Sequence, residues 1–537
     1  MALPTDAALE TIDEPWGCRT RLEHHFAGRM LRCMTDRPAH AGALLSEAAR
    51  RWPLAEALVD GERRWTFTRL DEQVTALASR LQSGGVQCGD RVALHLGNSA
   101  EFVLALLAST RAGAVVVPLS TRWGPGEIEH ALADARPRAL ISGGISGARS
   151  LAYGDVWELV AGEPGRDDAA FEGLRQAVPW CPPGIDEDDD WAILYTSGTT
   201  GRPKGAVQTH LGIVHGALQF TRCWRLQPGE RSILAVPGTH AAGLGVIFTM
   251  LACGGCTIVM KSFGAAAFLS LAAAERMSYA AMVPAMYNLL LREPQFNPAA
   301  LRAWRVGGYG AAPMPPALIA AFATRMPALE LVNAYGCTES TQPLVLMPPG
   351  QTATHANSVG RPVPGAELRI VQAEGRDARP GEPGEIWMRG PTVIPRYWGL
   401  PDADAEAFTD GWWHSGDIGS IDAQGYVYVH DRLKDMIVRG GHKVFSAEVE
   451  HVLAQHTAVM ESAIVGVPDP VLGERVQAFV VLKYPDATDA SVLADWCAAQ
   501  LADYKIPERW VLQTEPLPRN ANGKALKTEL RVRACAA

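Results

Sequence analysis

The sequence predicts an α/β protein with a large N-terminal domain of layered α/β subdomains, whose sheets are mostly parallel, and a small α+β C-terminal domain. The 537 residues are too many for one hydrophobic core. Strand-like runs alternate with helical patterns along most of the chain, and the last part, about a hundred residues, has strands and helices of its own. Apolar residues make up 47% and charged residues 20% of the chain, as is typical of a globular protein.

The clearest alternation lies in the first quarter of the chain. Strand-like residues 92–96 precede a helical pattern over 100–111 and a valine-rich strand at 115–117. This order is typical of parallel strands joined by crossover helices, which cover both faces of a sheet. The apolar stretch 102–119 contains Arg111, so we interpret it as a buried helix followed by a strand and not as a membrane span.

A domain boundary is expected late in the chain. After a strand-like run at 425–429, residues 431–435 lead into a segment that carries its own strands and helices. This segment is long enough to fold as a small domain. We therefore expect an N-terminal domain at residues 1–431 and a mobile C-terminal domain at residues 432–537.

Charge and cysteine usage disfavour several classes of protein. The formal net charge of −9 is spread along the chain without a run of Lys or Arg, so nucleic acid is not an expected partner. Four acidic residues stand in the first nineteen, where a secretory signal would be basic and then apolar, so we expect no export and a cytoplasmic location. The ten cysteines are scattered, and the lone CxxC of Cys253 and Cys256 favours a structural role over zinc or redox chemistry.

The strongest motif is a loop rich in glycine and hydroxyl side chains. It reads Tyr-Thr-Ser-Gly-Thr-Thr-Gly-Arg-Pro-Lys-Gly over residues 195–205 and directly follows an apolar, strand-like run at 191–194. Glycines let backbone N–H groups wrap phosphate oxygens, hydroxyls add donors, and a lysine adds positive charge. It is not a Walker A loop, because the glycine spacing differs and Gly205 follows the lysine. A surface turn is the alternative, but such a turn needs only about two or three of these residues. The phosphate contacts are expected from Thr196, Ser197, Gly198, Thr199, Thr200 and Lys204.

Five more motifs follow in order. They are residues 310–313 (Gly-Ala-Ala-Pro), 333–339 (Asn-Ala-Tyr-Gly-Cys-Thr-Glu), 411–417 (Gly-Trp-Trp-His-Ser-Gly-Asp), Arg432, and 518–524 (Pro-Arg-Asn-Ala-Asn-Gly-Lys). Together with the phosphate loop they run from residue 195 to residue 524, in the order of the family whose resemblance covers nearly the whole chain. On these motifs the chain resembles the superfamily of acyl-CoA synthetases, peptide-synthetase adenylation domains and beetle luciferases. The resemblance implies that ATP and Mg²⁺ are used to activate a carboxylic acid as an acyl-AMP.

The resemblance also assigns the contacts with adenine. Gly310, Ala311, Ala312 and Pro313 would form the loop beside the base, although an isolated match of this kind is more typical of a helix-entry turn. The ring of Tyr335, next to Gly336, would pack on adenine, since a flat ring stacks on a base.

Two neighbouring residues would contact phosphate and metal. By the same resemblance the hydroxyl of Thr338 reaches the α-phosphate and Glu339 binds Mg²⁺, because a carboxylate is a natural ligand for a hard cation shared with phosphates. Ordinary packing at a strand end is a reasonable alternative for Cys337 and a poor one for Glu339.

Asp417 and Arg432 are assigned to the ribose side. A carboxylate can accept both ribose hydroxyls, and the arginine would add a second contact with ribose or phosphate. Ser415 stands where the family usually has Thr, and it keeps the hydroxyl. Following Asp431, Arg432 would otherwise be part of a solvated surface pair.

The C-terminal domain is expected to carry the reactive lysine. Lys524 follows loop-forming Asn and Gly, and by resemblance it bridges the substrate carboxylate and the α-phosphate during adenylation; an exposed loop lysine is the alternative. Family members rotate this domain between two half-reactions, and the hinge position matches Lys434.

After rotation, a glycine loop would line the tunnel for the thiol of coenzyme A. Its residues are Gly440, Gly441, His442 and Lys443, and the two glycines permit close approach of the backbone. Many relatives have Asn or Gln where Lys443 stands. A contact with coenzyme A phosphates and a solvated position both stay open for this lysine.

The acyl pocket is expected after the phosphate loop, at residues 237–244. Amino-acid-activating relatives have an Asp there, but this chain has no carboxylate, so a substrate ammonium would be buried unpaired. Small side chains leave room and favour a fatty or aryl acid. His240 either gates the pocket, approaches the substrate carboxylate or is a packed core histidine. The pocket candidates are His240, Ala241, Ala242, Gly243, Tyr309, Gly336, Cys337, Gln342 and Pro343.

These features predict an acid–thiol ligase. It would form an acyl-AMP with release of pyrophosphate and then an acyl-CoA thioester, with ATP, Mg²⁺ and coenzyme A as cofactors. A stand-alone enzyme that loads a separate acyl carrier protein uses the same first step and is the alternative. A nucleotide-binding regulator is disfavoured, because binding alone would not require Lys524.

Overall fold

The computed structural model describes residues 11–14, 16–26, 28–143, 157–160, 181–196, 203–519 and 525–536. The chain divides into two compact units. Unit 1 comprises Met1–Leu368 and Met388–Trp413, and unit 2 comprises Arg369–Trp387 and His414–Ala537. The predicted boundary between residues 431 and 432 falls inside unit 2 and stays a prediction.

The first large sheet of unit 1 is buried on both faces. Val92, Leu94 and Val116 pack against one set of helices, whereas Val115 and Val117 pack against α4. All pairs are parallel except the one between β10 and β11, so the predicted alternation of strands and crossover helices is confirmed. The order is β11 (Lys204–Thr209), β10 (Asp190–Thr196), β7 (Val115–Pro118), β6 (Arg91–His95), β8 (Ala139–Ser142) and β9 (Trp157–Val160).

The second large sheet has nine strands. The neighbours from β16 to β4 are all parallel, and the two edges are antiparallel. The order is β18 (Arg361–Pro362), β17 (Val345–Leu346), β16 (Glu330–Tyr335), β15 (Val306–Gly310), β14 (Tyr279–Met282), β12 (Arg231–Leu234), β13 (Cys256–Val259), β4 (Glu56–Asp60) and β5 (Arg63–Thr66).

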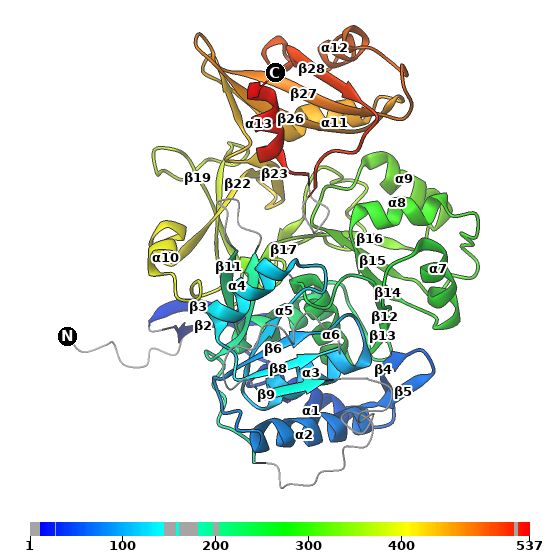
Figure 1. Ribbon diagram of the computed structural model, residues 1–537, viewed down its shortest axis with the longest axis vertical. Coiled ribbons are helices and arrows are strands. Elements are labelled where there is room, and N and C mark those ends of the chain that lie inside the picture. The colour runs from blue at the N-terminus through cyan, green and yellow to red at the C-terminus, as the bar shows by residue number, and fades with distance from the viewer. Residues whose placement is uncertain are drawn as a thin grey trace, which may run out of the picture. The chain divides into compact units, whose positions relative to one another are not determined.

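Helices of unit 1 share the cores of these sheets. Helices α5 and α6 pack side by side (Figure 1), and α6 is apolar on all sides, as expected for a buried helix. It ends at Gly254, whose φ of +70° is the left-handed conformation of a helix C-terminus. The helices are α1 (Ala41–Arg51), α2 (Phe67–Ser83), α3 (Ala100–Arg111), α4 (Pro125–Ala135), α5 (His210–Cys223), α6 (Ala241–Cys253), α7 (Ala265–Ala274), α8 (Pro284–Arg292), α9 (Pro316–Arg325) and α10 (Pro401–Ala407).

The remaining strands before residue 433 form two smaller sheets. The first is antiparallel: β1 (Ile12–Asp13), β2 (Arg19–His25) and β3 (Arg29–Met34). The second contains β19 (Glu367–Val371), β20 (Gly384–Arg389), β22 (Trp412–Ile421), β21 (Phe408–Thr409) and β23 (Val427–Arg432).

The C-terminal part of unit 2 is an α+β layer, as predicted. Along β27, Val476 and Val480 face α11 and α12, whereas Phe479 and Val481 face α13. The elements are β24 (Ile437–Arg439), β25 (His442–Val444), α11 (Ser446–Ala454), β26 (Val459–Asp469), β27 (Gly473–Leu482), α12 (Ala490–Ala498), β28 (Arg509–Gln513) and α13 (Lys527–Ala536). Among the described helices, none is long and apolar enough to cross a membrane.

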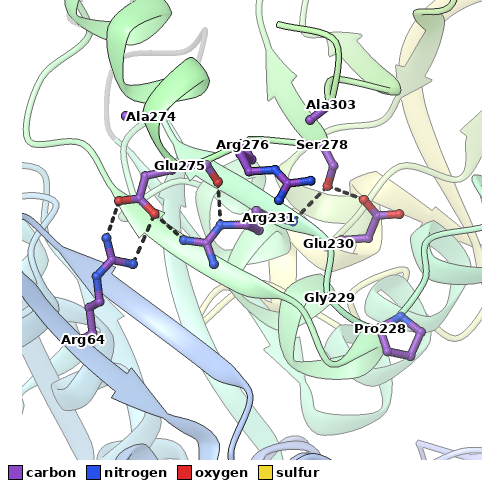
Figure 2. A pocket seen from close by; sticks show the side chains of 10 residues that line it. All are labelled: Arg64, Pro228, Gly229, Glu230, Arg231, Ala274, Glu275, Arg276, Ser278 and Ala303. Carbon is purple, nitrogen blue, oxygen red and sulfur yellow. Dashed lines mark hydrogen bonds and ion pairs between the residues drawn. The ribbon is translucent and has the colours of Figure 1, made fainter. Parts of the chain in front are cut away.

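A charged cavity of about 620 Å³ lies at the amino ends of β12 and β14 (Figure 2). Arg64 donates to Glu275 at 2.6 Å, and Arg231 pairs with the same carboxylate and with Glu56 at 2.7 Å. These ion pairs therefore connect the β4–β5 hairpin with the end of α7. We interpret this network as a structural brace.

The brace predicts a stability effect of Glu275→Gln. The side chain is 11% exposed, so losing its charge leaves Arg64 and Arg231 poorly paired and lowers the free energy of unfolding by about 1–3 kcal/mol. Urea unfolding at neutral pH measures this loss. Glu62→Gln, in the exposed turn between β4 and β5, is the matched control and should leave the midpoint unchanged.

The same variant should lose its effect in acid. Burial raises the pKa of Glu275, but the hydrogen bonds and charges of Arg64 and Arg231 outweigh burial and set the pKa below the usual 4.5. A lowered pKa gives stability that is present above 4.5 and is lost as the pH falls through the folded-state value. A stability gap between wild type and variant that grew on acidification would contradict the brace.

Candidate functional site

Three of the predicted motifs of unit 1 gather at one edge of the nine-stranded sheet. Strands β12, β15 and β16 are parallel members of that sheet, and their carboxyl ends lead to His240, Ala311 and Gly336. The carboxyl ends of parallel strands meet at the same edge, which is where open α/β sheets bind ligands. The structure thus places three separate sequence motifs along one edge.

Close backbone packing shapes the loop after β15. Gly310 lies opposite Ala334 of β16, and a Cβ at Gly310 would collide with the carbonyl oxygen of Ala334. Ala311 then adopts a φ of +65°, which is strained for a residue with a Cβ. Ala311, Ala312 and Pro313 are all exposed, so their backbone is open to a ligand. Their role beside adenine stays a prediction.

The segment after β16 forms a tight turn. Tyr335, Cys337 and Thr338 are half-buried, and Thr338 begins a short 3-10 helix, Thr338–Ser340. The hydroxyl of Ser340 accepts the N–H of Cys337 at 3.0 Å, and a Cβ at Gly336 would lie 2.6 Å from Pro343 Cα. Only glycine therefore fits at position 336.

The phosphate-loop lysine lies near the predicted metal ligand. Lys204 is opposite Thr196 in the β10–β11 hairpin, and its Nζ is 5.4 Å from the ring centroid of Tyr397. The hydroxyl of Tyr397 donates to Glu339 Oε1 at 3.2 Å. Gln208, also on β11, donates its amide to the carbonyl oxygen of Thr338 at 3.2 Å. These contacts connect the two large sheets of unit 1 at the site.

Tyr397 is a site residue that the sequence analysis missed. Its backbone is fixed by a bridge to Ala206, and the next residue, Trp398, donates its N–H to the carbonyl of Gly205 at 2.8 Å. Burial and the negative charge of Glu339 raise the pKa of Tyr397, so its hydroxyl stays protonated and donates. No sequence pattern at residue 397 signals this contact, because it depends on a fold that joins residues far apart in the chain.

Two of the acyl-pocket candidates, Gln342 and Gly243, are buried next to backbone atoms. Gln342 is buried and donates to the carbonyl oxygen of Ala241 at 2.9 Å, in a space left by the missing side chains of Gly216 and Gly245. Gly243 is buried, and a Cβ there would collide with the backbone of residue 237.

The remaining candidates differ in exposure. Tyr309 is buried, and burial raises its pKa to about 12. His240 is half-buried, and burial together with the charge of Arg122 lowers its pKa, which favours the neutral ring. Ala242 is exposed and Pro343 is half-buried. Their place in an acyl pocket stays a prediction.

In unit 2 the predicted ribose residues form a pair. Asp417 and Arg432 are opposite one another on β22 and β23, with Arg432 Nε 2.8 Å from Asp417 Oδ1. Arg432 therefore pairs across the sheet with a buried carboxylate. Lys434 is exposed, and its carbonyl oxygen accepts Arg531 Nη2 at 3.0 Å.

The glycine loop of unit 2 is a two-residue hairpin turn. Gly440 and Gly441 connect β24 to β25 with φ values of +56° and +84°, a turn that favours glycine at both positions. His442 stacks on Tyr504 with ring centroids 4.4 Å apart, and Lys443 is exposed. Lys524 and the loop residues Ser197, Gly198, Thr199 and Thr200 lie outside the described residues.

Family models and relatives match nearly the whole chain. The AMP-binding enzyme model matches residues 45–398, and the AMP-binding enzyme C-terminal domain model matches residues 448–524. Feruloyl-CoA synthase of Amycolatopsis sp is 38% identical over 90% of this chain and 97% of its own length. The long-chain fatty-acid–CoA ligase FadD13 of Mycobacterium tuberculosis is 34% identical over 91% and 97%. The fatty acid–[acyl-carrier-protein] ligase ScoC of Streptomyces coeruleorubidus is 32% identical over 90% and 94%.

A solved structure shares the fold. The o-succinylbenzoate CoA synthetase MenE of Bacillus subtilis, in complex with its acyl-adenylate intermediate, has a TM-score of 0.81 and 28% identity, with 91% of this chain and 97% of that chain covered. MenE has also been solved with ATP and magnesium ion. The motifs, the site geometry and these matches agree, and the chain belongs to the AMP-binding enzyme family.

Proposed function

We propose that the protein is an ATP-dependent carboxylate–CoA ligase that activates a fatty or aryl acid. The contacts of Tyr397 with Lys204 and Glu339, beside the turn at Thr338, carry this proposal, because they gather a cation, a hydroxyl and a carboxylate at the ligand edge of the sheet. Relatives named as CoA ligases of ferulic and long-chain fatty acids support both the acceptor and the substrate class.

The first half-reaction brings two anions together. The substrate carboxylate attacks the α-phosphorus of ATP, a P–O bond forms, and pyrophosphate leaves. Lys524 would lie at the reacting oxygens, Lys204 near the leaving phosphates, and Thr338 at the α-phosphate. These residues hold the nucleophile in line and offset the charge that opposes its approach.

Glu339 fits the role of a magnesium ligand. It is half-buried at the site, and within the described residues the hydrogen bond at 3.2 Å from Tyr397 engages one of its two carboxylate oxygens. Mg²⁺ prefers one or two carboxylates together with substrate phosphates, and when bound it neutralises phosphate charge. Tyr397 would fix the orientation of the carboxylate and so acts as a positioning residue.

In the second half-reaction the thiol of coenzyme A attacks the acyl carbonyl. A C–S bond forms, the acyl–phosphate bond breaks, and AMP leaves. The C-terminal domain would rotate about Lys434 between the two steps, which brings the hairpin turn at Gly440 and Gly441 to the thiol. A carrier protein as the thiol donor is the second candidate, favoured by the relative ScoC. A role in fatty acid metabolism and a cytoplasmic location belong to the same proposal.

A substrate screen tests the proposal directly. Purified protein is incubated with ATP, Mg²⁺ and a panel of fatty, aryl and amino acids, with and without coenzyme A, and the products are identified by mass spectrometry. We expect an acyl-CoA from a fatty or aryl acid only when coenzyme A is present. An acyl-AMP that accumulates and ignores coenzyme A would favour the carrier-protein candidate, and activation of an amino acid alone would refute the substrate class.

Lys524→Ala should separate the two half-reactions. The variant is expected to lose acyl-AMP formation, because the charge at the reacting oxygens is gone, yet to transfer the acyl group of a preformed acyl-AMP to coenzyme A. Pyrophosphate exchange and thioester formation measure the two steps. Lys261→Ala, at an exposed position of unit 1, is the control. Normal adenylation by Lys524→Ala would show that another residue does this work.

Tyr397→Phe should weaken metal-dependent adenylation without unfolding the site. Loss of one hydrogen bond to a carboxylate is expected to reduce kcat/KM for ATP about tenfold and to raise the Mg²⁺ concentration needed for half-maximal rate. A merely structural role would lower the melting temperature and leave the Mg²⁺ requirement unchanged. Tyr484→Phe, at a side chain that is 63% exposed, is the matched control.

A further inference from the structure

Three metal-ligating side chains meet on the small N-terminal sheet, apart from the adenylation site. They are Glu23 and His25 on β2 and Cys33 on β3. One donor atom from each, a carboxylate oxygen, an imidazole nitrogen and the thiol sulfur, lies within 4.8 Å of the other two. His25 is 5% exposed and Cys33 is fully buried. The proposed reaction uses none of them.

The orientation of His25 is fixed by a carboxylate behind it. Its Nδ1 lies 2.7 Å from Asp188 Oδ1, and Asp188 Oδ2 accepts the backbone N–H of Phe26 at 2.9 Å. A carboxylate only accepts, so Nδ1 carries the proton in this contact. In this arrangement a carboxylate holds Nδ1 while Nε2 points away from that carboxylate, which is typical of histidine ligands of metals.

The other nitrogen of His25 faces a second carboxylate. Nε2 is buried and has no hydrogen-bond partner among the described residues, and it lies 3.5 Å from Glu23 Oε2. Two lone pairs that face each other repel unless a cation stands between them. A proton would be enough to relieve the repulsion between the nitrogen and the oxygen. The nearby sulfur of Cys33 is a soft donor, and its presence favours a metal ion over a proton.

Arg37 and Arg21 hold Glu23 from the other side. Arg37 donates to both oxygens of Glu23, at 2.5 and 3.2 Å, and Arg21 Nη2 donates to Oε1 at 2.9 Å. Arg37 also pairs with Glu187 at 2.8 Å, which offsets its charge. Because each carboxylate oxygen has two lone pairs, Glu23 can still use one lone pair on the side that faces His25. The arginines thus act as outer partners that orient this ligand.

We propose that Glu23, His25 and Cys33 bind a divalent transition metal of the zinc class, with Asp188 as the outer partner of the histidine. Nitrogen, sulfur and oxygen donors together suit Zn²⁺ or Co²⁺ and do not suit Mg²⁺ or Ca²⁺. Three protein ligands leave a fourth position for water. The metal would tie the β2–β3 hairpin to the segment that carries Asp188, and the site is independent of the proposed ligase reaction.

Metal retention by the full-length protein tests the site. Protein stripped with a chelator is incubated with one equivalent of Zn²⁺, desalted, and analysed by inductively coupled plasma mass spectrometry. Wild type is expected to retain about one zinc per chain, and Cys33→Ser and His25→Gln to retain none. Cys223→Ser, at another buried thiol, and His24→Gln, at the exposed neighbour, are the matched controls. Equal retention by wild type and Cys33→Ser would overturn the proposal.

Cobalt spectroscopy keeps the test decisive if a variant folds poorly. Co²⁺ added to the stripped wild type should give a thiolate-to-cobalt absorption band and a tetrahedral visible spectrum, and Asp188→Asn should weaken binding about tenfold. Absence of the thiolate band in folded wild type would refute the metal site.

Discussion

The parallel pairing of β15 with β16 is the constraint on which the site of unit 1 depends. Gly310 stands opposite Ala334, and the absence of a Cβ lets the two backbones approach closely at the last pair of the ladder. A shift of the register by one residue would turn Tyr335 to the other face of the sheet. The register therefore decides that the loop at Ala311 and the turn at Thr338 leave the sheet together. Both motifs owe their position to this backbone contact and not to each other's side chains.

A second set of contacts connects the two large sheets at this edge. Gln208, on the antiparallel strand β11 of one sheet, holds the carbonyl oxygen of Thr338, which follows β16 of the other sheet. Tyr397 adds a contact from a third segment, because it lies over Lys204 and donates to Glu339. The ring of Tyr397 thus contacts the cation through its face and the carboxylate through the hydroxyl at its edge. In the proposed reaction, both charges would act on a phosphate group and its metal.

Helices and strands with strong sequence patterns could be predicted from the sequence. Residues whose roles depend on contacts with distant parts of the chain could not. The helical pattern at 100–111 is confirmed as α3, and the strand-like runs at 92–96 and 191–194 as β6 and β10. The phosphate-loop and Glu339 motifs are recognisable because each needs several unusual residues in a row. Tyr397 and Asp188 have no such local pattern, because the contacts that single them out are with residues 58 and 163 positions away in the chain. Pairing across the fold, and not composition, defines them.

The pairing of Asp417 with Arg432 orients the side chain that we propose as a ribose ligand. Asp417 is only 8% exposed, and a buried carboxylate needs a charged or hydrogen-bonding partner. Arg432 Nε lies 2.8 Å from Oδ1, and this ion pair limits the rotation of the carboxylate. In the proposed ribose site, a carboxylate already held in one orientation would lose less conformational entropy when it binds, so the ion pair would favour binding through preorganisation.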